Sequence, residues 1–178
     1  MRAPRIDSSW TLFLDRDGVL NRKIENGYVL NTSMLEVLPG ALEAVSSLAR
    51  RFGAIVIVTN QRGIARGLMT QEDLTQVHSH LLEAIRSEGG RIEAIFVCPH
   101  DTQENCDCRK PKSGLALQAK KQFSGIVFAK SVLVGDSDTD IEMGKTLGMF
   151  TIRVGRGTGN ETGDIVVSSL LEFARYLA

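Results

Sequence analysis

Four short apolar runs, at residues 11–14, 54–58, 92–97 and 131–134, most constrain what this chain can fold into. The runs are rich in β-branched residues, which is typical of strands buried on both faces of a parallel sheet. Segments with the apolar spacing of amphipathic helices lie between them, and this alternation predicts an α/β fold. With 178 residues, of which 43% are hydrophobic, the chain can bury one sizeable core, so we expect a single domain over residues 1–178.

The expected helices begin at recognisable signals. Pro39-Gly40 is typical of a helix start, and the residues from Thr70 to Asp73 resemble a capping box. A third helix should begin after Ser113, with the inward-facing residues Leu115, Leu117 and Ala119. Two more strands, at 149–154 and 165–167, and a final amphipathic helix complete the expected fold.

The first apolar run is followed directly by Asp15-Arg16-Asp17-Gly18. Ligands of open α/β sheets bind at the carboxyl ends of the strands, so Asp15 and Asp17 are expected at the mouth of a site. Two acids in such a place are costly unless a cation or a proton offsets their charge. An Asx-rich turn after a strand is the alternative interpretation of this local pattern.

Polar side chains follow the second and fourth runs as well. Thr59-Asn60-Gln61 ends the second, and Asp136 and Asp140 follow the fourth. Three or four carboxylates brought together at one sheet edge would repel each other unless a divalent cation lies among them, and oxygen ligands suit Mg²⁺. A lysine, a hydroxyl and an amide opposite that cation would bind a tetrahedral dianion, so the pattern favours phosphoryl transfer.

The third run leads into a cluster of soft metal ligands, Cys98, His100, Cys106 and Cys108. Three thiolates and an imidazole are the ligand set of a closed tetrahedral Zn²⁺ site, which would be structural because no position remains for water. Free thiols or a transient redox pair are the alternatives. The cluster runs directly into Arg109-Lys110-Pro111-Lys112, so zinc would orient this basic segment.

The sequence leaves open the roles of three loops and two histidines. Residues 22–38 show no periodicity, and their position next to Asp17 favours a flap over the site. Residues 62–67 carry two guanidinium groups that could bind phosphate or form a solvated basic turn. His78 and His80 point in different directions on a helix, so we expect surface or packing histidines rather than ligands. Residues 155–159 are expected to form a mobile loop.

Charge and hydropathy exclude several classes of partner. Basic and acidic residues both number 21, so no long-range field draws the chain to nucleic acid or to an anionic membrane. No run of about 18 apolar residues is present, and residues 1–7 lack the apolar core of a signal peptide. We therefore expect a cytoplasmic monomer whose partner is a small phosphorylated metabolite.

Taken in order from residue 12 to residue 140, these motifs resemble those of the haloacid dehalogenase (HAD) superfamily of aspartate-nucleophile phosphatases. The cysteine–histidine loop that runs into Arg109 is similar to that of two of its families, the D,D-heptose 1,7-bisphosphate phosphatases and the histidinol-phosphate phosphatase domain. The resemblance implies a three-layer α/β/α Rossmann-like fold with a parallel central sheet, a zinc-ordered loop and no large cap domain.

The resemblance also implies roles for individual residues. Asp15 would be the nucleophile, Asp17 the general acid and base, and Thr59 and Lys110 would stabilise the transferring phosphoryl group. Asp15, Asp136 and the backbone carbonyl of Asp17 would hold Mg²⁺. The residues expected to bind substrate are Glu25, Asn26, Gly27, Tyr28, Asn60, Gln61, Arg62 and Arg109.

The resemblance does not extend to every position. Arg62 stands where the heptose enzymes commonly carry a small residue, and Ser137 stands where they tend to place a lysine that Arg62 could replace. The expected reaction is removal of the 7-phosphate of heptose 1,7-bisphosphate, a step toward lipopolysaccharide precursors, and histidinol phosphate is the alternative substrate. A receiver-like signalling domain or a non-catalytic zinc-loop module is a more distant alternative.

Overall fold

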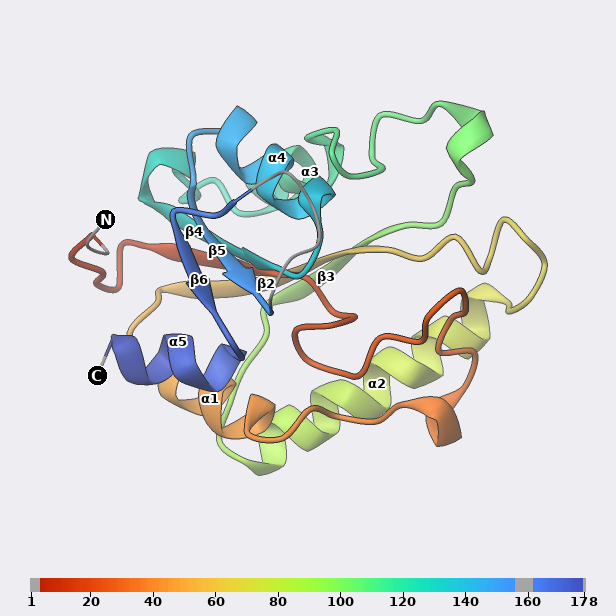
Figure 1. Cartoon of the computed structure of the whole chain (residues 1–178), viewed down its shortest axis with the longest axis horizontal. Helices are drawn as coiled ribbons and strands as arrows, with labels where there is room; N and C mark the ends of the chain where they lie inside the picture. The colour runs from red at the N-terminus through yellow and green to blue at the C-terminus, as the bar shows by residue number, and fades with distance from the viewer. Residues whose placement is uncertain (1–3, 156–161, 178) are drawn as a thin grey trace.

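The computed structural model describes residues 4–155 and 162–177 of the chain. Its six strands form one parallel sheet in the order β3-β2-β1-β4-β5-β6 (Figure 1). The strands are β1 (Thr11–Leu14), β2 (Ala54–Asn60), β3 (Ala94–Cys98), β4 (Ser131–Gly135), β5 (Phe150–Val154) and β6 (Ile165–Val167). The order places β1 at the centre, so the acidic motif that follows it lies in the middle of the sheet edge.

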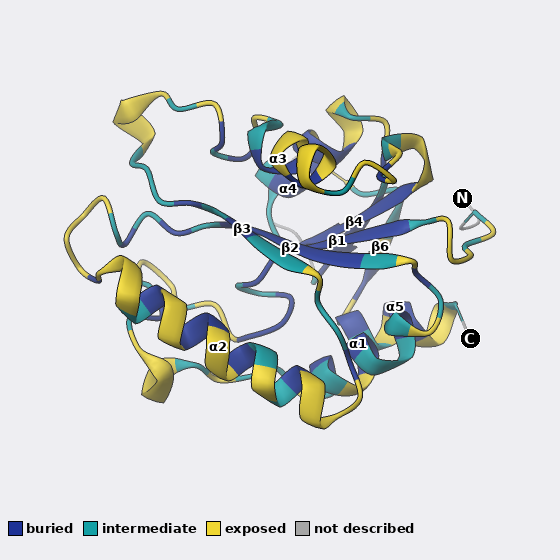
Figure 2. Cartoon of the chain, turned by 180° about the vertical axis from the view of Figure 1, so that it is seen from behind, coloured by how far each residue is buried: buried dark blue, intermediate teal, exposed yellow. Residues whose placement is uncertain are grey.

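Helices cover both faces of the sheet, which gives the three-layer α/β/α architecture that was expected (Figures 1 and 2). One layer contains α1 (Ala41–Ala49), α2 (Gln71–Ser87) and α5 (Leu170–Tyr176), and the other contains α3 (Gly114–Gln122) and α4 (Asp138–Thr146). Short 3-10 helices lie at Thr32–Met34, Thr102–Glu104 and Phe128–Lys130. None of the helices in the described residues combines the length and apolarity needed to cross a bilayer.

Two apolar cores meet at β1. Leu12 and Leu14 belong to the core between the sheet and the α1, α2 and α5 layer, whereas Phe13 belongs to the core beneath α3 and α4. All four residues of the strand are buried, because strands flank it on both edges and helices cover both faces. A strand fixed on all sides in this way holds the residues that follow it rigidly.

The structure also differs from the sequence-based expectation. The helix α4 was not expected, because its acidic start resembles a turn; Ser137 and Asp140 form the capping box that begins it. The prediction that Leu117 faces inward was wrong: this side chain is exposed, and Ala116 is buried instead. Ser113 stands before α3 without a side-chain capping hydrogen bond. Most of the loop expected at 155–159 lies outside the described residues.

The segment at residues 22–38 is tied to the edge of the site at both ends. Isolated bridges join Asn21 to Asp17 and to Val37, and Arg22 forms an exposed ion pair with Glu36 at 2.7 Å. The chain between these points runs beside the carboxyl ends of the central strands, on the side of α2 (Figure 1). Its position therefore agrees with the expected flap.

Candidate active site

The acidic side chains that follow the two central strands converge. Asp15 follows β1, Asp136 follows β4, and Asp140 lies in the first turn of α4; one oxygen of each lies within 4.8 Å of the others. Gly18 allows this approach, because it adopts a φ of 84° and a Cβ atom there would collide with the Asp136 carboxylate. Three carboxylates in this arrangement can bind a divalent cation through oxygen.

Lys110 is buried within this acidic group. Its Nζ atom donates to Asp15 Oδ1 at 2.8 Å, to Asp140 Oδ1 at 2.6 Å and to the backbone carbonyl of Val58 at 2.9 Å. Burial alone would lower the pKa of Lys110, but Asp140 and Asp15 raise it above its ordinary value, so the ammonium stays charged. Burial and the neighbouring Asp140 in turn raise the pKa of Asp15.

Asp17 has a different environment from Asp15. Both of its oxygens lie 3.0 Å from Arg16 Nη2, while Asn21 and Gln61 donate to them at 2.9 and 2.8 Å. Burial alone would raise the pKa of Asp17, but the Arg16 charge and these hydrogen bonds hold it below its ordinary range. The carboxyl of Asp17 is therefore ionised and fixed by four donor contacts in the resting site.

The side chain of Arg16 is fully buried, and its Nη1 atom lies 3.1 Å from His78 Nε2. Burial and the nearby Arg16 lower the pKa of His78 to about 4, so the imidazole is neutral at pH 7. Sequence reasoning treated Arg16 only as part of a motif and His78 as a surface or packing residue. The sequence did offer one signal. An arginine between two acids, directly after a buried strand, lies in a buried site, and its guanidinium then needs a buried acceptor.

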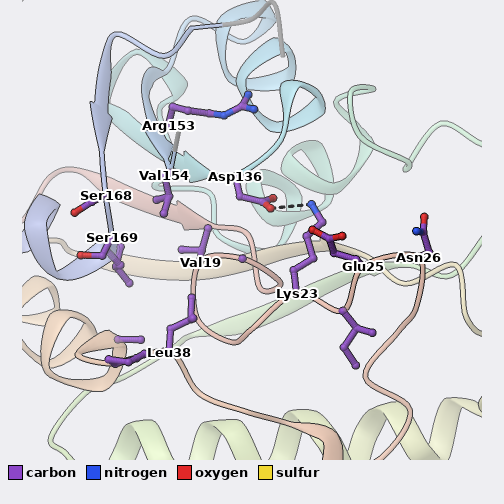
Figure 3. A pocket seen from close by; sticks show the side chains of 16 residues that line it. Val19, Lys23, Glu25, Asn26, Leu38, Asp136, Arg153, Val154, Ser168 and Ser169 are labelled. Atoms are coloured by element: carbon purple, nitrogen blue, oxygen red, sulfur yellow. Dashed lines mark hydrogen bonds and ion pairs between the residues drawn. The ribbon is translucent and has the colours of Figure 1, made fainter. Parts of the chain in front are cut away.

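Two cavities meet at the acidic group. The smaller, of about 230 Å³, is lined by Asp15, Asp17 and Lys110, and the larger, of about 850 Å³, has Asp136 in its lining (Figure 3). Lys23 lines both, and its Nζ donates to Asp136 Oδ2 at 2.7 Å. Sequence reasoning did not select Lys23, because nothing in residues 22–38 distinguishes it from a solvated lysine.

The residues expected to bind substrate separate into three groups. Those on the smaller cavity are Gly27, Tyr28, Asn60 and Arg109. Glu25 and Asn26 line the larger cavity. Gln61 and Arg62 line neither: Gln61 is buried and donates to Asp17 and Thr59, and the Arg62 guanidinium pairs with Asp101 at 2.7 Å. Arg62 therefore does not replace the lysine that the heptose enzymes tend to carry at the position of Ser137.

Asn60 also fixes the backbone of Lys110. Its amide oxygen accepts from the Lys110 N–H at 3.1 Å, and its amide nitrogen donates to the Lys110 carbonyl at 3.3 Å. This pair of hydrogen bonds attaches the basic segment to the end of β2. Asn60 thus positions Lys110 besides lining the cavity.

The four expected zinc ligands come together at the end of β3. The sulfur atoms of the three cysteines and the His100 Nδ1 atom all lie within 4.8 Å of one another, and Cys98 Sγ is 3.6 Å from Cys106 Sγ. Burial raises the pKa of Cys98 and of Cys108, so their thiolates need a cation nearby. The donor set and its spacing fit a tetrahedral Zn²⁺ ion.

Comparisons with known proteins identify relatives of this chain. A family model described as HAD-hydrolase-like matches residues 107–172. The D-glycero-alpha-D-manno-heptose-1,7-bisphosphate 7-phosphatase of Mycobacterium bovis is 37% identical over 98% of this chain and 94% of its own. The D-glycero-beta-D-manno-heptose-1,7-bisphosphate 7-phosphatase of Haemophilus influenzae is 34% identical over 93% of this chain and 95% of its own.

Solved structures give the same relationship. The D,D-heptose 1,7-bisphosphate phosphatase of B. bronchiseptica, complexed with magnesium and phosphate, has a TM-score of 0.87 at 31% identity and covers 94% of this chain and 97% of its own. The L-2-haloacid dehalogenase of Xanthobacter autotrophicus, at 12% identity and a TM-score of 0.61, shares the fold. The chain is therefore a phosphatase of the HAD superfamily. Within that superfamily it belongs to the heptose-1,7-bisphosphate 7-phosphatase family.

The lowered pKa of His78 predicts a pH-dependent loss of stability. The imidazole takes up a proton near pH 6.5 in the unfolded chain but only near pH 4 in the folded chain. The contribution of His78 to the free energy of unfolding is therefore fully present above pH 6.5 and is lost as the pH falls toward 4. Between pH 7 and pH 5 this loss should be roughly 2 kcal/mol. Urea unfolding should show it in the wild type and not in His78→Gln; equal losses in both would contradict the assignment.

Proposed function

We propose that this protein removes the 7-phosphate of D-glycero-D-manno-heptose 1,7-bisphosphate through an aspartyl-phosphate intermediate, with Mg²⁺ as its cofactor. The observation that carries the proposal is the contact of Asp15 with the buried Lys110 ammonium, beside Asp136. The names of the relatives supply the substrate. Because all residues of the proposed reaction lie around one sheet edge, we also propose that residues 1–178 form a single catalytic domain.

The acidic group fits a magnesium ion. Asp136 Oδ1 is buried and accepts no hydrogen bond from the described residues, which is the situation of an oxygen that ligates a cation. Asp15, Asp136 and the backbone carbonyl of Asp17 would hold Mg²⁺. The bound ion would neutralise negative charge on the transferring phosphoryl group.

The reaction has two steps with balanced proton transfers. An Asp15 oxygen attacks phosphorus and forms the O–P bond while the bond to the substrate oxygen breaks, and the Asp17 carboxyl gives its proton to that leaving oxygen. Asp17 then takes a proton from a water molecule whose oxygen attacks phosphorus, which releases phosphate and restores Asp15. The Asp17 carboxyl is ionised in the resting site. It takes up a proton when the phosphate dianion binds, because the negative charge of the dianion raises the pKa of Asp17.

Thr59 and Lys110 would stabilise the phosphoryl group during both steps. Lys110 is already charged and oriented by Asp140 and by the Asn60 clamp, so little reorganisation is needed when negative charge develops. Arg109, on the wall of the smaller cavity, would bind the second phosphate, because a guanidinium can contact two phosphate oxygens.

The substitution Asp15→Asn should abolish turnover without unfolding the chain. The amide is a poor nucleophile, so kcat should fall by at least about 10³-fold, whereas Glu142→Gln on the exposed face of α4 should leave it unchanged. Magnesium-dependent phosphate release and circular dichroism measure the two effects. Turnover by the folded Asp15→Asn variant at the wild-type rate would disprove the assignment of Asp15 as the nucleophile.

The substrate assignment is tested with matched esters. We expect kcat/KM for heptose 1,7-bisphosphate, measured for both anomers, to exceed that for histidinol phosphate. Arg109→Met should raise KM for the bisphosphate about ten- to hundredfold and change KM for heptose 7-phosphate little, because only the bisphosphate carries the group that Arg109 binds. Arg86→Met, at an exposed position of α2, is the control. A preference for histidinol phosphate would overturn the substrate assignment and leave the reaction class unchanged.

The cysteine–histidine cluster is proposed to bind one structural Zn²⁺ ion. Lys112 Nζ donates to the Asn105 and Cys106 carbonyls at 3.0 and 2.8 Å, so the basic segment is attached to the loop that carries the cluster. Zinc would therefore fix the loop from which Lys110 reaches Asp15.

Loss of zinc should lower stability and activity together. Protein purified without chelator should contain about one equivalent of zinc by elemental analysis. Cys106→Ser should lose the metal, melt at a lower temperature and lose kcat through the displaced Lys110. Chelation followed by addition of Zn²⁺ should restore the wild type only. A metal-free wild type with full kcat would overturn the zinc proposal.

A further inference from the structure

We propose that His78 is a positioning residue for the reaction: through Arg16 it holds Asp17 where that carboxyl can give its proton to the leaving oxygen. The inference rests on the proposed function, because it assumes the acid role of Asp17. His78 lies 62 positions from Arg16 along the chain and contacts neither of the two cavities described above. It would act entirely through the buried guanidinium.

The contacts of Arg16 support this role. Among the described residues, only two accept from its guanidinium N–H groups: Nη2 lies 3.0 Å from both Asp17 oxygens, and Nη1 lies 3.1 Å from His78 Nε2. Arg16 has no exposed surface, so bulk water does not compete with either acceptor. The plane of the guanidinium, and with it the direction of the contact to Asp17, is therefore set by His78.

The imidazole suits this task in its neutral form. His78 Nε2 can accept from Arg16 only when it carries no proton, and the lowered pKa of His78 keeps it in that form at neutral pH. An aliphatic side chain in its place would leave a buried N–H of Arg16 without an acceptor, which favours a rotated guanidinium. Glutamine keeps an acceptor oxygen and should preserve much of the geometry.

The helix that carries His78 is itself firmly placed. The buried residues Leu74, Val77 and Leu81 anchor α2, and the Thr70–Asp73 capping box fixes its first turn. A catalytic carboxyl that is supported through a rigid element keeps its direction better than one supported by a loop. Asn21 and Gln61 also hold Asp17, so loss of His78 should weaken the orientation of this carboxyl without abolishing it.

The test compares two phosphate esters in the first turnover. The heptose alkoxide needs a proton as it leaves, whereas the phenolate of p-nitrophenyl phosphate is stable without one, so only the first reports on Asp17 as an acid. His78→Leu should slow release of the heptose alcohol about tenfold in rapid-quench experiments and change nitrophenolate release by less than about twofold. His78→Gln should recover most of the rate, and His80→Leu, exposed on the same helix, should match the wild type.

Each outcome separates the inference from the function on which it rests. Equal slowing of both esters by His78→Leu would show a merely structural role and overturn the inference; the nitrophenolate rate also reports how much of the variant is folded. Asp17→Asn provides the reference. If it slows only the heptose ester and His78→Leu does not, the inference alone fails, whereas an Asp17→Asn variant without this selectivity overturns the proposed acid itself.

Discussion

The site depends first on the buried ammonium of Lys110, which lies between Asp15 and Asp140. Two carboxylates beside each other in a buried site repel each other, and this charge offsets that repulsion. The lysine comes from a loop, so its place has to be secured from elsewhere: the Asn60 side chain binds its backbone, and the Val58 carbonyl accepts from its Nζ atom. The parallel sheet contributes the fixed frame, because β1 and β2 are neighbours in register.

The cysteine–histidine cluster belongs to the same arrangement. A basic loop that must enter an acidic pocket has few apolar residues with which to hold itself, and a metal can supply this stability in a small number of residues. The loop connects β3 to the segment that Asn60 clamps at the end of β2, so the two anchors act on the same few residues. The basic loop is thus attached at two points, at the cluster and at Asn60.

The sequence was sufficient to predict the sheet and the acids that follow its strands, because continuous apolar runs and the residues after them are local signals. It could not predict contacts between distant elements where no motif marks either partner. Lys23 on Asp136 and His78 on Arg16 join residues 113 and 62 positions apart, and nothing local marks either pair. Helix α4 was missed for a related reason: its acidic first turn resembles a metal loop, while Ser137 and Asp140 also cap the helix.

The motif after β1 shows how one short segment provides two carboxyls with different chemistry. Asp15 faces the acidic group, where burial and Asp140 raise its pKa. Asp17 lies against Arg16, whose charge lowers the pKa of Asp17. The residue between them turns into the core toward α2 and so separates the two environments. A cation lies against each carboxyl, Lys110 against Asp15 and Arg16 against Asp17. The two carboxyls therefore differ through their burial and their neighbours rather than through residue type.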